Sequence, residues 1–317
     1  MLPLLLALLS LAADPAPAPE PPKAESLSVE EATVRCESGE SEVCSQVGGW
    51  LVDHNQPGRG ARLLQLGCDQ GHALACRNLA ATLFVDTQEG GPDNVRAVAL
   101  HEKACGLGEE HGCADAGWAL MFGRGGVEPD PEKGRMYLDK ACSLGLIQSC
   151  VELGGALATG MAGTPDYTAA QEAIGRAGKL AGPDQVPKLM RLTGSIAVLE
   201  QATPACTAGD GDACFQRGLQ LMKLGAPNRA VDALGEACAN DSVCGCTVGG
   251  DWALQRGAPE EGRARLVRGC DLGAKQPCEQ LASVLEEGVG GEVDAKGAKK
   301  ARKRAVKMER KGRVCTF

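Results

Sequence analysis

Seven cysteine pairs with one spacing constrain the fold of this 317-residue chain more than any other feature. The two cysteines of a pair always lie eight residues apart: Cys36/Cys44, Cys68/Cys76, Cys105/Cys113, Cys142/Cys150, Cys206/Cys214, Cys238/Cys246 and Cys270/Cys278. In one continuous α-helix, eight steps of about 1.5 Å would separate the two Cα atoms by ~12 Å, beyond the ~7 Å limit for a disulfide. Either the cysteines are unbonded, or the chain turns back between them.

The residues around the pairs favour a turn. Three positions after the first cysteine stands a residue that tolerates the left-handed conformation in which helices end, namely Gly39, Gly71, Gly108, Gly145, Gly209, Asp241 and Gly273. Four positions after the second cysteine stands Gly or Ala, and seven positions after it stands Leu in six copies. This rhythm marks one face of a new helix, with a small residue where a neighbouring helix comes close. Each pair therefore brackets a helix–turn–helix junction, in which a disulfide can form.

The junctions recur with a period in the thirties. First cysteines follow one another at 32, 37, 37, 64, 32 and 32 residues. We interpret 64 as two units, one of which has Gly178 and Val186 in place of its cysteines. Paired helices with such a period are typical of an α-solenoid. We expect an all-α superhelical solenoid of about eight repeats over residues 31–293, one of them lacking cysteines.

A stretch such as EKACGLGEEHGCADAGWALMFGRGGVEPDPEKGRMYLDKACSLG resembles Sel-one-like repeats, which are relatives of tetratricopeptide repeats. The paired cysteines are similar to those of a cysteine-rich secreted bacterial subclass, and the resemblance covers roughly residues 30–312. It implies a right-handed superhelix that acts as a protein-interaction scaffold, with one disulfide per repeat. Some cysteine-rich members are described as β-lactam-binding proteins or weak β-lactamases.

The cysteines have three interpretations: structural disulfides, metal ligands or redox pairs. We favour disulfides, because a zinc or redox site usually shows a Cys-x-x-Cys spacing that is absent here. The seven pairs account for fourteen of the sixteen cysteines, and the remaining two are Cys244 and Cys315. For these two, an intramolecular bridge competes with free thiols and with a disulfide-linked dimer.

The first residues indicate export. MLPLLLALLSLAA is an apolar run followed by small residues, and we expect a signal peptide at 1–13 and a Pro-rich linker at 14–30. The run is too short to span a membrane, so we expect no transmembrane segment in the mature chain. Sixteen cysteines fit an oxidising compartment, periplasmic or extracellular.

Motifs for catalysis, metals and cofactors are not found in the sequence. No serine has Lys at the third position after it, and there is no Lys-Thr-Gly segment, so the serine β-lactamase pattern is missing. His54, His72, His101 and His111 lack metal-ligand spacing, and we expect each on a helix surface or in a turn. We therefore predict no catalytic residue, no metal and no cofactor.

Trp50, Trp118 and Trp252 fall five or six residues after a second cysteine, on the first helix of their repeats. In solenoids that helix tends to line the concave surface, where an exposed Trp can anchor a ligand. Packing between repeats is the competing interpretation, because Trp is mostly buried on average.

Residues 294–317 carry ten Lys or Arg and two Asp or Glu, a local charge of +8 in a chain whose total is −8. Ala298, Ala301, Ala305 and Met308 follow a helical stripe that can dock on the last repeat, which predicts a basic capping helix. Its basic face is a candidate for contact with an anionic surface. Nucleic acid is disfavoured, because the chain has few aromatic residues to stack on bases.

We predict an exported, non-enzymatic scaffold whose concave face binds a protein or peptide. The alternative is a binder or weak hydrolase of β-lactams or cell-wall-related small molecules, which is carried by the family resemblance alone.

Overall fold

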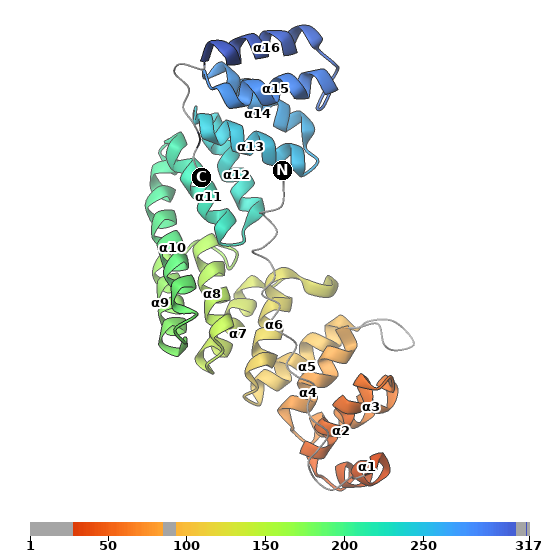
Figure 1. Ribbon diagram of the computed structural model, residues 1–317. Helices are drawn as coiled ribbons and strands as arrows, with labels where there is room; N and C mark the ends of the chain where they lie inside the picture. Colours follow the sequence, from red (N-terminus) through yellow and green to blue (C-terminus); the bar gives the residue numbers. More distant parts are fainter. Residues whose placement is uncertain (1–27, 85–92, 309–314, 316–317) are drawn as a thin grey trace. The chain divides into compact units, whose positions relative to one another are not determined.

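The computed structural model describes residues 28–84, 93–308 and 315 (Figure 1). Within these residues it contains sixteen α-helices, one short 3-10 helix and no strand, and none of these helices is long and apolar enough to cross a membrane. The predicted all-α architecture of helix–turn–helix repeats with about one disulfide per repeat is confirmed. The expected signal peptide and most of the expected linker lie outside the described residues.

The chain divides into two compact units, Met1–Ser149 and Cys150–Phe317. The helices of the first unit are α1 (Val29–Glu37), α2 (Ser41–Asp53), α3 (Pro57–Asp69), α4 (Ala73–Phe84), α5 (Asn94–Gly106), α6 (Glu110–Phe122), η1 (Arg124–Gly126) and α7 (Pro131–Ser143). Consecutive helices pack on one another, and α2 also contacts α4. This is the nearest-neighbour packing of a solenoid.

The second unit begins within α8 (Ile147–Thr159). It continues with α9 (Tyr167–Leu180), α10 (Val186–Thr207), α11 (Gly211–Lys223), α12 (Pro227–Ala239), α13 (Val243–Gln255), α14 (Pro259–Asp271), α15 (Lys275–Glu287) and α16 (Ala295–Met308). Here α11 also contacts α13, and α13 contacts α15. The predicted basic segment forms α16, which packs on α15 through the buried Ala298, Ala301 and Ala305.

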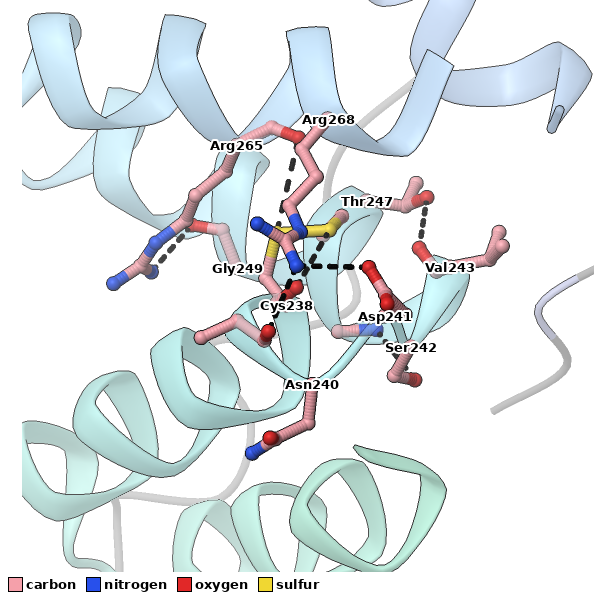
Figure 2. Close-up of a disulfide and its surroundings, with 12 residues drawn as sticks. Cys238, Asn240, Asp241, Ser242, Val243, Thr247, Gly249, Arg265 and Arg268 are labelled. Atoms are coloured by element: carbon pink, nitrogen blue, oxygen red, sulfur yellow. Dashed lines mark hydrogen bonds and ion pairs between the residues drawn. A yellow bond between two sulfur atoms is a disulfide. The ribbon is translucent and has the colours of Figure 1, made fainter. Parts of the chain in front are cut away.

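Left-handed residues end the helices at the junctions, as the sequence predicts. The six glycines named above have φ between +87° and +108°, and Asp241 has φ +61°. Figure 2 shows the junction that contains Asp241, where Arg268 of the following helix α14 donates to the Ala239 carbonyl and to Asp241 Oδ1, both at 2.8 Å. Ser242 then caps α13 by accepting from the Gly245 N–H at 3.3 Å. At this junction an aspartate takes the place of the glycine, and Arg268 compensates its charge.

The small residue after each second cysteine lies where two helices touch. A Cβ built on Gly48 would fall 2.7 Å from Leu64 Cγ, and a Cβ on Gly117 would fall 2.9 Å from Leu138 Cγ. Gly218 meets Leu234 and Gly250 meets Leu266 in the same way, at 2.9 Å. The leucines seven positions after the second cysteine are all buried: Leu51, Leu83, Leu120, Leu157, Leu221 and Leu285. One close helix contact is thus repeated along both units.

The cysteines of six junctions are bonded to each other, with Cα–Cα distances between 4.3 and 4.8 Å: Cys36–Cys44, Cys68–Cys76, Cys105–Cys113, Cys206–Cys214, Cys238–Cys246 and Cys270–Cys278. Cys142 and Cys150 are also disulfide-bonded. A further disulfide joins Cys244 to Cys315 across 71 residues of sequence, and no cysteine is free.

The 64-residue spacing holds three helices, α8, α9 and α10, where two full units would have four. Interpreting it as two complete units was therefore wrong. The turn predicted between Gly178 and Val186 is present, because α9 ends at Leu180 and α10 begins at Val186. After it, α10 runs unbroken for 22 residues to Thr207, with Gly194 in its interior. A lone glycine costs a helix only ~1 kcal/mol and does not end it, so this segment forms one long helix.

Candidate functional site

The helix that contains the second cysteine of a junction is called the first helix of its repeat. The register of its residues decides which side chains reach solvent. The fifth position after the cysteine is exposed or half-buried in every repeat. The sixth position, one step or 100° further round the helix, is buried or half-buried in every repeat. Trp118 occupies the fifth position, whereas Trp50 and Trp252 occupy the sixth.

Trp50 and Trp252 pack within their units. Trp50 lies against the buried cluster around Leu51 and Leu63, and its ring stacks on His54 with centroids 3.9 Å apart. Trp252 lies against the cluster around Phe215 and Leu234. For these two residues the structure favours packing between repeats over ligand binding.

Trp118 differs because 37% of its side chain is exposed. Its ring contacts the ring of Phe122 one helical turn later, with centroids 4.4 Å apart, and 43% of Phe122 is exposed as well. Asp115 lies three residues before Trp118, so all three side chains share one face of α6. An exposed aromatic pair beside a carboxylate is a surface that can hold an apolar side chain and a polar group together.

Two side chains from neighbouring helices meet the Asp115 carboxylate. Asp115 Oδ2 lies 3.7 Å from Arg77 Nε of α4 and 3.7 Å from His101 Nδ1 of α5. Arg77 and Asp115 are half-exposed, at 35% and 43%, whereas only 2% of His101 is exposed. His101 Nδ1 has no hydrogen-bond partner. The site thus combines a partly open ion pair with a buried imidazole behind it.

Burial lowers the pKa of the His101 imidazole below its ordinary value. The Asp115 carboxylate opposes this shift, while the Arg77 and Arg124 charges add to it, so His101 is neutral at pH 7. The Phe84 ring stacks over His101 at 5.6 Å, and the Arg124 guanidinium lies 5.9 Å from the Phe84 centroid. Expecting His101 on a helix surface was wrong. It lies on the buried stripe of α5, together with Ala97 and Ala104.

The other three histidines lie on surfaces or in turns, as expected. His54 Nδ1 lies 2.8 Å from the Trp50 carbonyl, and His72 Nδ1 accepts from the Ala75 N–H at 3.3 Å. His111 lies beside Glu109 and Glu110 at the start of α6, where the three side chains offer ligand atoms within 4.8 Å of one another. Glu109 also caps the helix by accepting from the Gly112 N–H. Cys206, Cys214 and Glu236 also lie close together, but the two sulfurs are bonded to each other and are not thiolates.

A hollow of about 710 Å³ lies in the second unit between α10, α11 and the start of α13. Its walls are mostly small and apolar, and its two carboxylates are engaged. Asp210 caps α11 by accepting from backbone N–H groups, and Asp212 accepts from the Ser242 hydroxyl at 2.9 Å. Gln201 and Gln216 also line this hollow, but the aromatic ring in its lining, Phe215, is buried. The α4–α6 surface, which has an exposed aromatic pair, remains the leading candidate.

Of the three tryptophans predicted as candidates, only Trp118 presents a broad exposed ring. Arg77, Asp115 and Phe122 also belong to its surface and were not among the predicted site residues. Asp115 and Phe122 were recognisable from their spacing of three and four residues from Trp118. Arg77 was not, because its place follows from how α4, α5 and α6 pack in succession.

Comparisons with known proteins identify repeats of one family within the first unit of the chain. The family model of the Sel1 repeat matches residues 43–72, 73–109 and 111–146. Similar solved structures include a protective antigen of uropathogenic Escherichia coli that displays an SLR fold, with 17% identity over 87% of this chain and a TM-score of 0.48. This chain covers 63% of the length of that antigen. A Sel1 repeat protein from Oxalobacter formigenes is 18% identical, with 90% of this chain and 88% of that chain covered and a TM-score of 0.43. No curated protein sequence matches.

Proposed function

We infer that this chain, a protein of Sel1 repeats between residues 43 and 146, is a scaffold whose first helices bind a peptide segment of another protein. The exposed Trp118–Phe122 pair on α6 carries this proposal. Trp is the residue type that most often dominates binding energy when a partner buries it. The three matched repeats include the helices that build this surface.

The chemistry of the surface suggests the kind of segment it accepts. The aromatic pair offers an apolar platform for one large side chain. Beside it, Arg77 is a donor and Asp115 is an acceptor, each about one-third to one-half exposed. A peptide backbone presents one donor and one acceptor per residue, so an extended segment can satisfy both groups. We propose a partner segment with a bulky apolar residue in an extended stretch.

Export is part of the proposal. Sixteen disulfide-bonded cysteines indicate an oxidising location, because the cytosol keeps thiols reduced. We propose that the protein works outside the cytosol, in the periplasm or beyond the cell. Fractionation of cells that express the native sequence tests this step.

We do not extend the proposal to turnover of β-lactams. The sequence lacks the Ser-x-x-Lys and Lys-Thr-Gly segments, and the only buried histidine among the described residues is packed under Phe84. Sustained hydrolysis by the purified protein, abolished by a single substitution, would contradict this choice and favour the enzymatic alternative.

A peptide library tests the binding surface directly. Peptides selected on the purified oxidised protein are labelled, and their affinities are measured by fluorescence anisotropy. We expect the double variant W118A/F122A to lose about thirtyfold in affinity, because truncating a central Trp typically costs at least ~2 kcal/mol.

The matched control is V95A/M136A, which truncates two apolar side chains on α5 and α7 that are 72% and 66% exposed. Its affinity should stay close to that of the unmodified protein. Thermal melts of both variants show whether the fold is retained. Equal affinities in the two variants would place the binding surface elsewhere.

A further inference from the structure

The exposed face of α16 carries a row of lysines that the scaffold function does not use. Lys296, Lys300, Lys303 and Lys307 follow the spacing i, i+4, i+7 and i+11. At 100° per residue these four side chains fall within about 60° of one another around the helix axis. The row extends for about 16 Å along the helix. All four lysines are exposed.

The row lies opposite the face by which α16 docks. Ala298, Ala301 and Ala305 are at most 4% exposed and pack against the last repeat. On the helical wheel their centre lies about 160° from the centre of the lysine row. The lysines therefore point away from the repeats, at the end of the array.

The two arginines of α16 act differently from the lysines. Arg302 pairs with Glu286 of α15, and Arg304 Nη1 lies 2.5 Å from Asp271 of α14. These pairs tie the helix to the repeats behind it. None of the four lysines has a hydrogen-bond or ion-pair partner within the described part of the chain.

A cap built only for solubility would mix charges of both signs, yet α16 contains no Asp or Glu. Like charges one turn apart disfavour the helix by a few tenths of a kcal/mol per pair. The arrangement is favourable when an anionic surface faces it. We propose that the lysine row of α16 docks the protein on an anionic lipid surface.

A lipid surface fits this row better than an acidic peptide does. Its charged groups are lysines, which bind anions as point charges without the paired geometry of arginine. A bilayer with anionic head groups is broad and mobile, and it matches any straight row of cations. Each lysine near such a surface strengthens binding by about fivefold at moderate salt.

Sedimentation with vesicles tests the proposal on the full-length oxidised protein. Phosphatidylcholine vesicles containing one-third phosphatidylglycerol should bind the protein, and pure phosphatidylcholine vesicles should not. Raising the salt to about 1 M shortens the screening length to ~3 Å and should release it. The variant K296Q/K300Q/K303Q/K307Q should bind more than about tenfold more weakly.

The matched control removes the same charge from other elements. Arg62, Arg135, Lys179 and Arg191 are exposed on α3, α7, α9 and α10 and have no partner within the described residues. Their fourfold change to Gln should leave vesicle binding nearly intact. Both variants should keep the helical circular dichroism of the parent, because the altered side chains make no hydrogen bond or ion pair with other described residues and Gln favours helix about as well as Lys and Arg.

Three results would overturn the proposal. One is the absence of binding to phosphatidylglycerol vesicles, and another is an equal loss in both variants, which would make net charge the cause. The third is salt-sensitive, lysine-dependent binding to soluble poly-glutamate without binding to vesicles, which would identify an acidic polymer as the partner.

Discussion

At the scale of single residues, one half-buried carboxylate lies among the first helices of the second unit. Both carboxylate oxygens of Asp251 in α13 accept from Gln280 Nε2 of α15, at 2.8 and 2.7 Å. Burial raises the pKa of Asp251, and the Gln280 hydrogen bond opposes this in part. Gln280 Oε1 is buried and has no partner. The pair therefore leaves one acceptor unsatisfied and keeps a charge partly desolvated.

We predict that D251N stabilises the protein at pH 7. An asparagine amide can donate to Gln280 Oε1 while its own oxygen still accepts from Nε2, which satisfies the unpaired acceptor. The expected gain in the free energy of unfolding is about 0.5–1.5 kcal/mol, measured by urea denaturation.

The gain should depend on pH with a definite sign. Because the pKa of Asp251 is raised in the folded protein, the folded state binds the proton more tightly, and stability falls as pH rises through the raised pKa. Asparagine does not titrate. The advantage of D251N should therefore shrink when the measurement is repeated near pH 4, and an advantage that grows at low pH would contradict this account.

His101 should make the first unit sensitive to acid. Its pKa is lowered in the folded protein, so the unfolded chain binds more protons between the lowered value and the ordinary ~6.5. The contribution of neutral His101 to the free energy of unfolding is then fully present above pH ~6.5, and it is lost as the pH falls through this window. We predict that H101L, which removes the buried unpaired nitrogen, flattens the decline in urea midpoint between pH 7 and pH 5.

The exposed His111 provides the control for this measurement. The variant H111L replaces a histidine whose side chain is about half exposed, and it controls for the general effect of exchanging His for Leu. Equal slopes for H101L and the unmodified protein would mean that other groups cause the decline.

At the scale of elements, the α9–α10 turn differs from the disulfide-bonded junctions. No cysteine links the two helices, and a groove of about 400 Å³ between them is lined by Ile174, Leu189 and Met190. Contacts between the helices include the bond between Tyr167 Oη and Thr203 Oγ1 at 2.8 Å. Gly175 and Gly178 face the same groove, with no atom within 4 Å of a Cβ built on either. These two glycines do not serve a close helix contact.

We predict that G175A/G178A stabilises α9. Each change removes conformational freedom from the unfolded chain at a helical position with open space, for about 0.5–1 kcal/mol each. Hydrogen exchange should slow in α9 and α10 in particular. In contrast, G218A should destabilise the protein, because its Cβ would lie 2.9 Å from Leu234 Cγ. If the two changes had the same sign, this distinction would fail.

The sequence predicted those parts of the fold that are marked by residues within each repeat. Turn residues such as Gly39 and buried leucines such as Leu51 recur at fixed distances from the cysteines, so one local rule accounts for every junction. The 64-residue stretch was misread because the rule has no marker there. No residue within α10 indicates that this helix is longer than its neighbours. Its length depends on the helices that pack against it on both sides.

The site was less predictable than the fold. Trp50 and Trp118 differ by one position relative to the second cysteine of their repeats. This difference tells a packed side chain from an exposed one only when it is known which face of the helix is buried. The meeting of Arg77, His101 and Asp115 joins three helices, and no spacing within one helix specifies it.

At the scale of the whole molecule, the disulfides divide into two kinds. The junction bridges with described partners each close a loop between residues eight apart, and their cysteines are at most 4% exposed. The Cys244–Cys315 bridge instead ties the C-terminal end of the chain back to α13 across 71 residues. Cys315 is 8% exposed and Cys244 is half-buried. In the chain-entropy model the long loop contributes about 4 kcal/mol, against about 2.5 for a nine-residue loop.

We predict that limited reduction opens Cys244–Cys315 before any junction bridge. A thiolate must reach a sulfur atom to displace it, and these two cysteines are the most exposed of the sixteen. Brief treatment with dithiothreitol, alkylation and peptide mass mapping should therefore label Cys244 and Cys315 first, while the helical circular dichroism changes little because the junction bridges remain closed. Label spread evenly over the junction cysteines would contradict the order. Labelling of Cys244 and Cys315 without any reductant would show free thiols, and a reducible dimer would show that the bond forms between two chains.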